Sequence, residues 1–457
     1  MGRMLTEKAL PRPPQSVPRP TAPKPVLPPH VAPDPQQANP ARRVAFYAGL
    51  VFLFIRLGVV PEVLFTLTGK NTPILYIFGG PAILGAVFIG GLQRTLKHRA
   101  SLLWLLFFGW MILAVPFSSW KGGSWDRISY YSRFELPLLL VVGGLAANWK
   151  EVRAVFFTIA CAAVFNLATA SLFGGLSNGR LNLAEMSGTL GNPNDLASQL
   201  LLVLPFLLFV ILDRQNIVLR VFLCGAIAYG FFLIFSTGSR GGLAALVFAY
   251  LVFLYCSNAA RRAAGLAVGA VALLTVPLFL PALTRNRLAT VVGENNEEAD
   301  ESSISRTYLF QQSVRYTLQH PLFGVGPEQF SNFEGLESRS KGFHGAWHAT
   351  HCAYTQVSSE CGVPALLFFT GGIASAVLLI VRLYRNAKRK GCRDIANACF
   401  CYLLAMAGYL AALAFLSNAY TFHLPAMIGL AISIGFAGTR EVARRSTQQT
   451  KAAATAF

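Results

Sequence analysis

The sequence predicts an all-α, polytopic integral membrane protein with about a dozen transmembrane helices. Its residues are 54% hydrophobic and only 13% charged. Apolar runs of about twenty residues, the length that an α-helix needs to cross a bilayer, recur along the chain. Lys and Arg gather in the short polar gaps between these runs, as orientation signals do, so the formal charge of +19 does not indicate nucleic acid as a partner.

The first 43 residues differ from the rest of the chain. They hold twelve of the 25 prolines and almost no clustered apolar residues. Such a segment cannot bury enough apolar surface to offset the entropy lost on ordering, so residues 1–43 are expected to be a disordered, Pro-rich cytoplasmic tail. No apolar run of the signal-peptide type precedes Arg42 and Arg43, and no cleavable signal peptide is expected.

Residues 44–283 are expected to hold helices 1–9 and residues 362–439 helices 10–12, with a second cytoplasmic tail at 440–457. Basic residues collect in alternate gaps and in both tails, which predicts cytoplasmic termini by the positive-inside rule. The expected spans are 44–64, 73–92, 100–118, 135–148, 154–174, 195–213, 218–238, 243–256, 264–283, 362–384, 395–416 and 424–439.

The gap at residues 284–361 is much longer than the others and is expected to be a large outer loop with helices of its own. It contains an amphipathic stretch at 305–319, a Gly-rich turn at 320–327 and a histidine-rich segment. Aromatic residues of the outer gaps are expected to anchor at headgroup level: Trp120, Trp125, Tyr130, Tyr131 and Trp347. The eight cysteines show neither metal-ligand spacing nor a disulfide framework.

Three short segments stand out on this outer side. The first contains Arg180 and, a few residues later, a turn-rich stretch at 188–197 in which Asn194 or Asp195 could cap a helix. The second is the Gly-rich turn 236–242 around Arg240, whose glycines allow close backbone approach to a ligand. The third joins residues 305–306, 320–326, 348–354 and 360–362.

In this order, the segments resemble the O-antigen ligase and O-antigen polymerase superfamily of bacterial membrane glycosyltransferases. The motifs that carry the resemblance are Gly-Asn-Pro-Asn at 191–194, Ser-Arg-Gly-Gly at 239–242 and His-Pro-Leu-Phe-Gly-Val-Gly at 320–326. It implies a GT-C-like fold in the bacterial inner membrane with one large periplasmic loop. It also implies transfer of a glycan from undecaprenyl diphosphate to an acceptor such as lipid A core or another glycan.

The resemblance further implies roles for individual residues. Arginines that match Arg180, Arg240 and Arg306 are associated with the lipid diphosphate in the family, and His351 matches the histidine that opens the helix before the next span. One position departs from the family pattern, because Cys352 stands where Asn or Ser is usual.

Physical chemistry leads to a compatible site. An arginine in a Gly-rich turn at the outer end of a span needs an anionic partner, and a diphosphate is one. His351, with an expected pKa near neutrality, is the candidate general base for the acceptor hydroxyl. Arg240 and Arg180 would stabilise the leaving diphosphate, and Arg306 would position phosphate or sugar. This single displacement would invert the anomeric configuration and needs neither metal nor cofactor. The remaining expected substrate-binding residues are Asn194, His348 and Tyr354.

The histidines also allow a competing hypothesis. His344, His348 and His351 have a spacing that would stack them on one helical face and could bind zinc or copper. However, glycines weaken a helix there, and no acidic or thiolate ligand falls at a matching position. Glu360 lies nine residues after His351, about half a turn round a continuous helix, and is therefore expected to be structural.

Other function classes remain open. Polymerases of the superfamily commonly carry two sizeable outer loops, so a single long loop favours a ligase over a polymerase. A secondary transporter would usually show ionisable residues near the bilayer midplane, whereas Arg56 is the only clear intramembrane charge in the sequence. A flippase would tolerate the same topology but would not need a base such as His351.

Overall fold

The computed structural model describes residues 40–455, apart from 89–90, 184–185, 187, 189, 290–296 and 343–346. The chain divides into two units, residues 1–39 and 40–457, and all that follows concerns the second. The expectation of a disordered tail falls mainly on residues outside the described range. Its boundary was wrong by a few residues, since the first helix begins at Pro40 rather than Val44.

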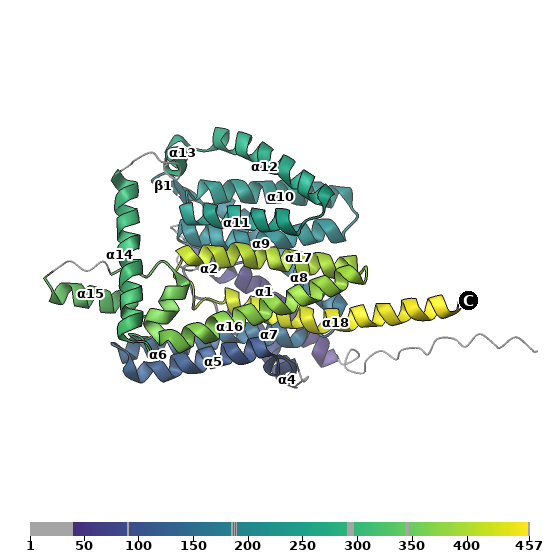
Figure 1. The fold of residues 1–457 in the computed structure, drawn as a ribbon, viewed down its shortest axis with the longest axis horizontal. Helices are drawn as coiled ribbons and strands as arrows, with labels where there is room; N and C mark the ends of the chain where they lie inside the picture. The colour runs from purple at the N-terminus through teal and green to yellow at the C-terminus, as the bar shows by residue number, and fades with distance from the viewer. Residues whose placement is uncertain are drawn as a thin grey trace, which may run out of the picture. The chain divides into compact units, whose positions relative to one another are not determined.

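The fold is all-α, as predicted, apart from one short hairpin (Figure 1). Each expected span contains a helix. The helices that overlap the expected spans are α1 (Pro40–Leu57), α2 (Val60–Thr68), α3 (Ile74–Phe88), α5 (Arg99–Ala114), α7 (Leu136–Leu145), α8 (Trp149–Phe173), α9 (Pro193–Asp213), α10 (Ile217–Ser236), α11 (Arg240–Cys256), α12 (Ala259–Phe279), α16 (Ala353–Arg389), α17 (Arg393–Ala412) and α18 (His423–Thr455).

Shorter elements connect these helices. The hairpin consists of β1 (Gly175–Ser177) and β2 (Arg180–Asn182), which pair antiparallel. The other connecting elements are α4 (Gly91–Leu96), the 3₁₀ turn η2 (Val115–Phe117), α6 (Lys121–Tyr130), the π-helical turn η3 (Tyr131–Glu135), α13 (Ala282–Ala289), α14 (Glu297–Gln319), α15 (Phe330–Ser340) and the 3₁₀ turn η4 (Leu413–Phe415).

Eight helices in the described part of the chain are long and apolar enough to cross a membrane, and nine if α1 and α2 form one broken span. Helices α3 and α11 are apolar but shorter. A polytopic membrane protein is therefore confirmed, whereas the count of about twelve spans stays a prediction. Helix α9 lies inside the bundle, packed against α8, α10, α11 and α17, so the residues at its amino end have a rigid support.

The first expected span is broken. Helices α1 and α2 meet at an angle of 65° around Val59, a β-branched residue held at φ 51. The carbonyl of Leu57, released from helical pairing, accepts hydrogen bonds from Asn166 Nδ2 (3.0 Å) and Gln199 Nε2 (2.6 Å). Inside a membrane, non-helical backbone is tolerated only where protein groups satisfy its hydrogen bonds, as Asn166 and Gln199 do here.

Arg56, beside this break, is not an isolated charge as the sequence suggested. Its guanidinium pairs with the buried carboxylate of Glu135 at 3.1 Å and lies 3.9 Å from that of Glu62. It also lies over the ring of Phe422, 4.3 Å from the centroid. A π-helical turn that ends at Glu135 brings this acidic partner to Arg56.

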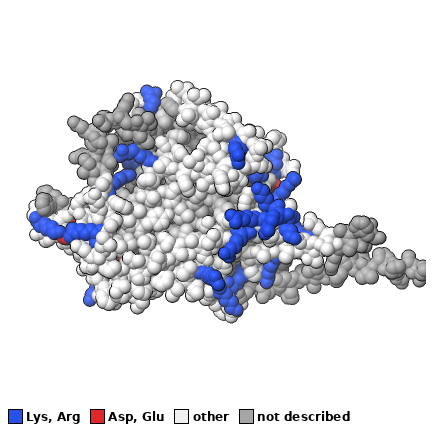
Figure 2. Space-filling view, in the orientation of Figure 1, with Lys and Arg blue, Asp and Glu red and all other residues white. Residues whose placement is uncertain are grey.

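The two ends of the bundle differ in charge. Helix α14 crosses one end of the bundle, and α15 lies beside it (Figure 1). Most of the Lys and Arg side chains visible in Figure 2 gather near the opposite end, where α16 ends and α17 begins. The segment 284–361 thus does carry helices at one end, and the charge difference fits the predicted orientation, which stays a prediction.

Candidate functional site

Arg180 is positioned by the β1–β2 hairpin. Asn178 and Gly179 form a two-residue turn with positive φ (51° and 67°), the conformation that an Asn-Gly hairpin turn adopts. The turn packs on α13, where Thr284 Oγ1 donates to the Gly179 carbonyl at 2.6 Å. Arg180, the next residue, donates from Nε to the Thr237 carbonyl (3.0 Å) and from a terminal nitrogen to Asn194 Oδ1 (2.8 Å). It therefore joins the first two segments singled out in the sequence.

Asn194 lies in the first turn of α9. The helix is capped by Asn192, whose side chain accepts the Asn194 N–H at 2.9 Å, and Pro193 occupies the first helical position. The cap expected at Asn194 or Asp195 was therefore wrong by a few residues. The side chain of Asn194 instead binds Arg180, and Asp195 accepts a hydrogen bond from Asn418 at 2.7 Å.

The Gly-rich turn around Arg240 begins α11. Ser239 caps the helix by accepting the Gly242 N–H at 3.0 Å, and Arg240 is the first helical residue. A Cβ at Gly241 would lie 2.6 Å from Phe415, and one at Gly242 would lie 2.8 Å from Ala197. Close packing of α11 on its neighbours therefore requires both glycines, in addition to any role in approaching a ligand.

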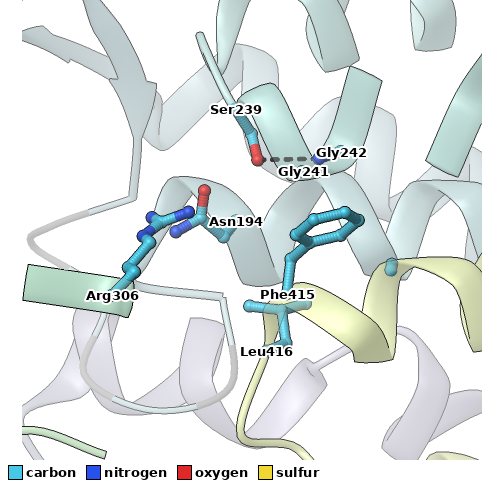
Figure 3. A pocket seen from close by; sticks show the side chains of 8 residues that line it. Asn194, Ser239, Gly241, Gly242, Arg306, Phe415 and Leu416 are labelled. Atoms are coloured by element: carbon cyan, nitrogen blue, oxygen red, sulfur yellow. Dashed lines mark hydrogen bonds between the residues drawn. The ribbon is translucent and has the colours of Figure 1, made fainter. Parts of the chain in front are cut away.

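These elements enclose a small open recess (Figure 3). In Figure 3 the side chains of Arg306, from α14, and Asn194 point toward one another across it. The residues that line the recess are Asn194, Ser239, Gly241, Gly242, Arg306, Ala412, Phe415 and Leu416. Arg240 sits between lining residues, although its own side chain is not among them. Two capped helix N-termini and a guanidinium group thus share one recess, an arrangement that favours an anion.

His351 lies just before α16 and beside this recess. Its backbone is left-handed (φ 54), and its N–H donates to Ser417 Oγ at 2.8 Å, one residue after the recess-lining Leu416. Burial, the nearby guanidinium of Arg306 and His348 together lower the pKa of His351 to about 4. The expectation of a pKa near neutrality was therefore wrong, although the imidazole is neutral at pH 7 and can accept a proton.

The two other expected substrate-binding residues differ in their surroundings. His348 is exposed and close enough to His351 to influence its charge. Tyr354 is half-buried, and its hydroxyl donates to the Leu410 carbonyl at 2.9 Å, so it holds α16 to α17. His344, the third histidine of the metal hypothesis, lies outside the described residues. Residues 347–350 are not helical, so His348 and His351 lack the helical stacking that this hypothesis assumed.

Glu360 secures the Gly-rich turn at 320–327 against α16. Its carboxylate accepts the N–H groups of Glu328 (2.9 Å) and Phe330 (3.3 Å). Its carbonyl accepts the N–H of Gly326, which has a φ of 113°. Glu360 is buried and each of its carboxyl oxygens accepts a backbone N–H, which fits the structural role predicted for it.

A loop that the sequence analysis did not single out supports the site. Residues 416–422, between α17 and α18, contact both His351 and the first turn of α9: Ser417 accepts the His351 N–H, and Asn418 donates to Asp195. The Ala419 N–H donates to Gln356 Oε1 at 3.2 Å, which fastens the loop to α16. The only signal in the sequence is a polar Ser-Asn pair directly after an apolar run.

The fold defines an all-α integral membrane protein with several membrane-spanning helices. Residues 225–370, from α10 into α16, match the family model described as O-antigen ligase. This match supports the assignment of the chain to the O-antigen ligase superfamily and confirms the resemblance seen in the sequence. No match was found among curated proteins.

Proposed function

We propose that this protein is an O-antigen ligase-like glycosyltransferase that moves a glycan from undecaprenyl diphosphate to a periplasmic acceptor such as lipid A core. The observation that carries the proposal is the recess in which Arg306, Asn194 and the N-terminus of α11 meet beside His351. It offers a cationic, partly buried site for a diphosphate next to a neutral imidazole. Both parts are needed for displacement at an anomeric carbon.

The diphosphate would bind at the arginines. Arg306 reaches the recess from α14, and Arg180 reaches its edge from the hairpin, where Asn194 orients it. Arg240 lies at the N-terminus of α11, whose dipole adds to the positive potential. Guanidinium groups held by protein contacts stabilise charge that grows on a leaving group without reorganising, so this proposal uses no metal ion.

His351 would act on the acceptor. Its imidazole takes the proton of the acceptor hydroxyl as the hydroxyl oxygen bonds to the anomeric carbon. The bond between that carbon and the diphosphate oxygen breaks, and undecaprenyl diphosphate leaves with the electron pair. Attack from the opposite face inverts the anomeric configuration. Burial is the main cause of the low pKa of His351, and repulsion from Arg306 adds to it. A bound diphosphate beside Arg306 would offset that repulsion, so substrate binding should make His351 a stronger base.

The runner-up function is an O-antigen or exopolysaccharide polymerase, which differs only in the acceptor. The chemistry of the recess is the same for both. Incubation of the purified protein with lipid-linked glycan and either lipid A core or a second lipid-linked glycan separates the two. Joining of glycan to lipid A core supports the ligase, and elongation of the lipid-linked glycan alone supports the polymerase.

Two observations favour a second class, a transporter or flippase. The broken α1–α2 pair and the buried Arg56–Glu135 pair are features that membrane transporters use at their binding sites. Flux of lipid-linked glycan across proteoliposome membranes would support this class. Transfer of glycan in detergent, where no compartments exist, would support the enzyme.

A further inference from the structure

Trp347 is an exposed aromatic residue whose indole packs against a glycine. It is 47% exposed, and a Cβ at Gly335 of α15 would lie 2.2 to 2.6 Å from three atoms of the indole. The similar distances to three ring atoms place the helix backbone against the face of the indole. The glycine therefore lets one face of the ring lie on α15 while other ring atoms remain open to solvent.

The backbone that carries this indole is held firmly. Trp347 has a φ of 53°, which is uncommon for a bulky residue, and its N–H donates to Glu334 Oε2 at 3.1 Å. Glu334 is fully buried, and its other oxygen accepts hydrogen bonds from Tyr308 (3.1 Å) and Ser338 (2.8 Å). Strained backbone persists where the surroundings impose it, and it is concentrated at ligand sites.

We propose that Trp347 is the platform on which a sugar ring of the acceptor stacks. This inference rests on the proposed function and names where its acceptor lies. The C–H groups on the face of a sugar ring carry partial positive charge, and the face of an aromatic ring carries negative charge. A general base contacts the acceptor hydroxyl, so the acceptor lies on the side of His351, and Trp347 comes four residues before this base.

Membrane anchoring is the alternative use of an exposed tryptophan, and the sequence alone favoured it. A membrane anchor needs an exposed ring. It needs neither a glycine for the ring to pack on nor a left-handed backbone held by a buried carboxylate. Trp125 illustrates the simpler case, since it is 56% exposed on the ordinary helix α6. The support beneath Trp347 favours a recognition role, and Trp125 offers a matched control.

Two substitutions test the platform from different sides. Trp347→Ala removes the ring and should raise the KM for core oligosaccharide released from lipid A severalfold, on the order of the loss of one aromatic ring contact. Gly335→Ala keeps the tryptophan but adds a methyl group that pushes the indole away from α15, so it should also raise the KM for the oligosaccharide. Because alanine is a better helix former than glycine, the second variant should keep its thermal stability. The kcat and the KM for the lipid-linked donor should stay unchanged in both.

Binding measurements separate this inference from the proposed function. Binding of the same core oligosaccharide to detergent-purified protein is measured by titration calorimetry, with no donor present. In a separate experiment, quenching of tryptophan fluorescence by brominated lipids reports contact with the membrane. Weaker binding in Trp347→Ala and Gly335→Ala, with normal binding in Trp125→Ala, supports the platform even if no transfer is found. Unchanged oligosaccharide binding in the two test variants overturns it. So does a change confined to lipid quenching, which would identify an anchor.

Discussion

Replacing Ser417 with alanine should slow glycan transfer without weakening donor binding. Ser417 Oγ accepts the N–H of His351 at 2.8 Å and lies 3.2 Å from the hydroxyl of Thr350. His351 adopts a left-handed backbone (φ 54), which costs a non-glycine residue roughly 1–2 kcal/mol. This hydrogen bond is one of the contacts that offset the strain, so Ser417 is a positioning residue for the proposed base.

The size of the effect follows from that bond. A hydrogen bond contributes about 0.5–1.5 kcal/mol net, so its loss should lower the equilibrium constant for the productive His351 conformer about 2- to 13-fold and kcat by up to the same factor. The KM for the lipid-linked donor should stay near its normal value, because Arg306 and Arg180 are held by other elements.

Steady-state transfer of a radiolabelled lipid-linked glycan to lipid A core, with donor concentration varied, gives kcat and KM separately. Ser417→Thr keeps the acceptor oxygen and should restore most of the rate, which a merely destabilised protein would not show. Wild-type kcat in Ser417→Ala would refute the positioning role. Equal losses in kcat and donor affinity that threonine fails to rescue would refute it as well.

Further predictions concern pH, binding, metal ions and topology. The pKa of His351 is lowered to about 4, so kcat/KM should stay constant above this pH and fall as the pH drops through it. The corresponding fall in kcat should occur at a higher pH, because bound diphosphate raises that pKa. Both pH-dependent falls should vanish in His351→Ala. Arg180→Lys cannot donate to both Thr237 and Asn194 in the same geometry, so donor affinity should fall about 5- to 100-fold in a binding assay. EDTA should leave the transfer rate nearly unchanged, and a loss that zinc restores would revive the histidine-cluster hypothesis. A reporter fused after Arg389 should read cytoplasmic and one inserted near Asn296 periplasmic, and the reverse at either site would refute the span count between them.

The helices could be predicted because their signal is local. Runs of apolar residues separated by basic gaps, with Gly or Asn near the helix ends, predict the spans, and the structure has a helix in each of them. The hairpin that holds Arg180 was missed, because strands of three residues are too short to show a period. Its turn residues Asn178 and Gly179 are nevertheless the strongest short hairpin signal, and they could have revealed it.

The site could be predicted only in part, because its contacts join distant segments. Of the residues chosen from the sequence, Asn194 and Arg306 line one recess, and Arg180 hydrogen-bonds to Asn194. Ser417 is 66 residues from His351 in sequence, and no local sequence pattern predicts the hydrogen bond between them. Glu135 is likewise 79 residues from Arg56, which is why Arg56 looked isolated.

The low pKa of His351 shows a second limit. The histidine could be chosen from its place in a motif, but the burial and the nearby Arg306 that change its basicity depend on how α14 crosses the end of the bundle (Figure 1). Residue type therefore indicates the chemistry, whereas the fold determines the pH at which it operates.

The most direct test of the mechanism compares wild type and His351→Ala in one assay. Purified protein in nanodiscs is incubated with undecaprenyl diphosphate-linked glycan and lipid A core, and the products are identified by mass spectrometry. Wild type should yield glycosylated lipid A core and free undecaprenyl diphosphate. His351→Ala should bind the donor normally and lose about 10²–10⁴-fold in rate, the usual contribution of a general base. A wild-type rate in correctly folded His351→Ala, or no transfer by wild type to any acceptor supplied, would contradict the mechanism at its centre.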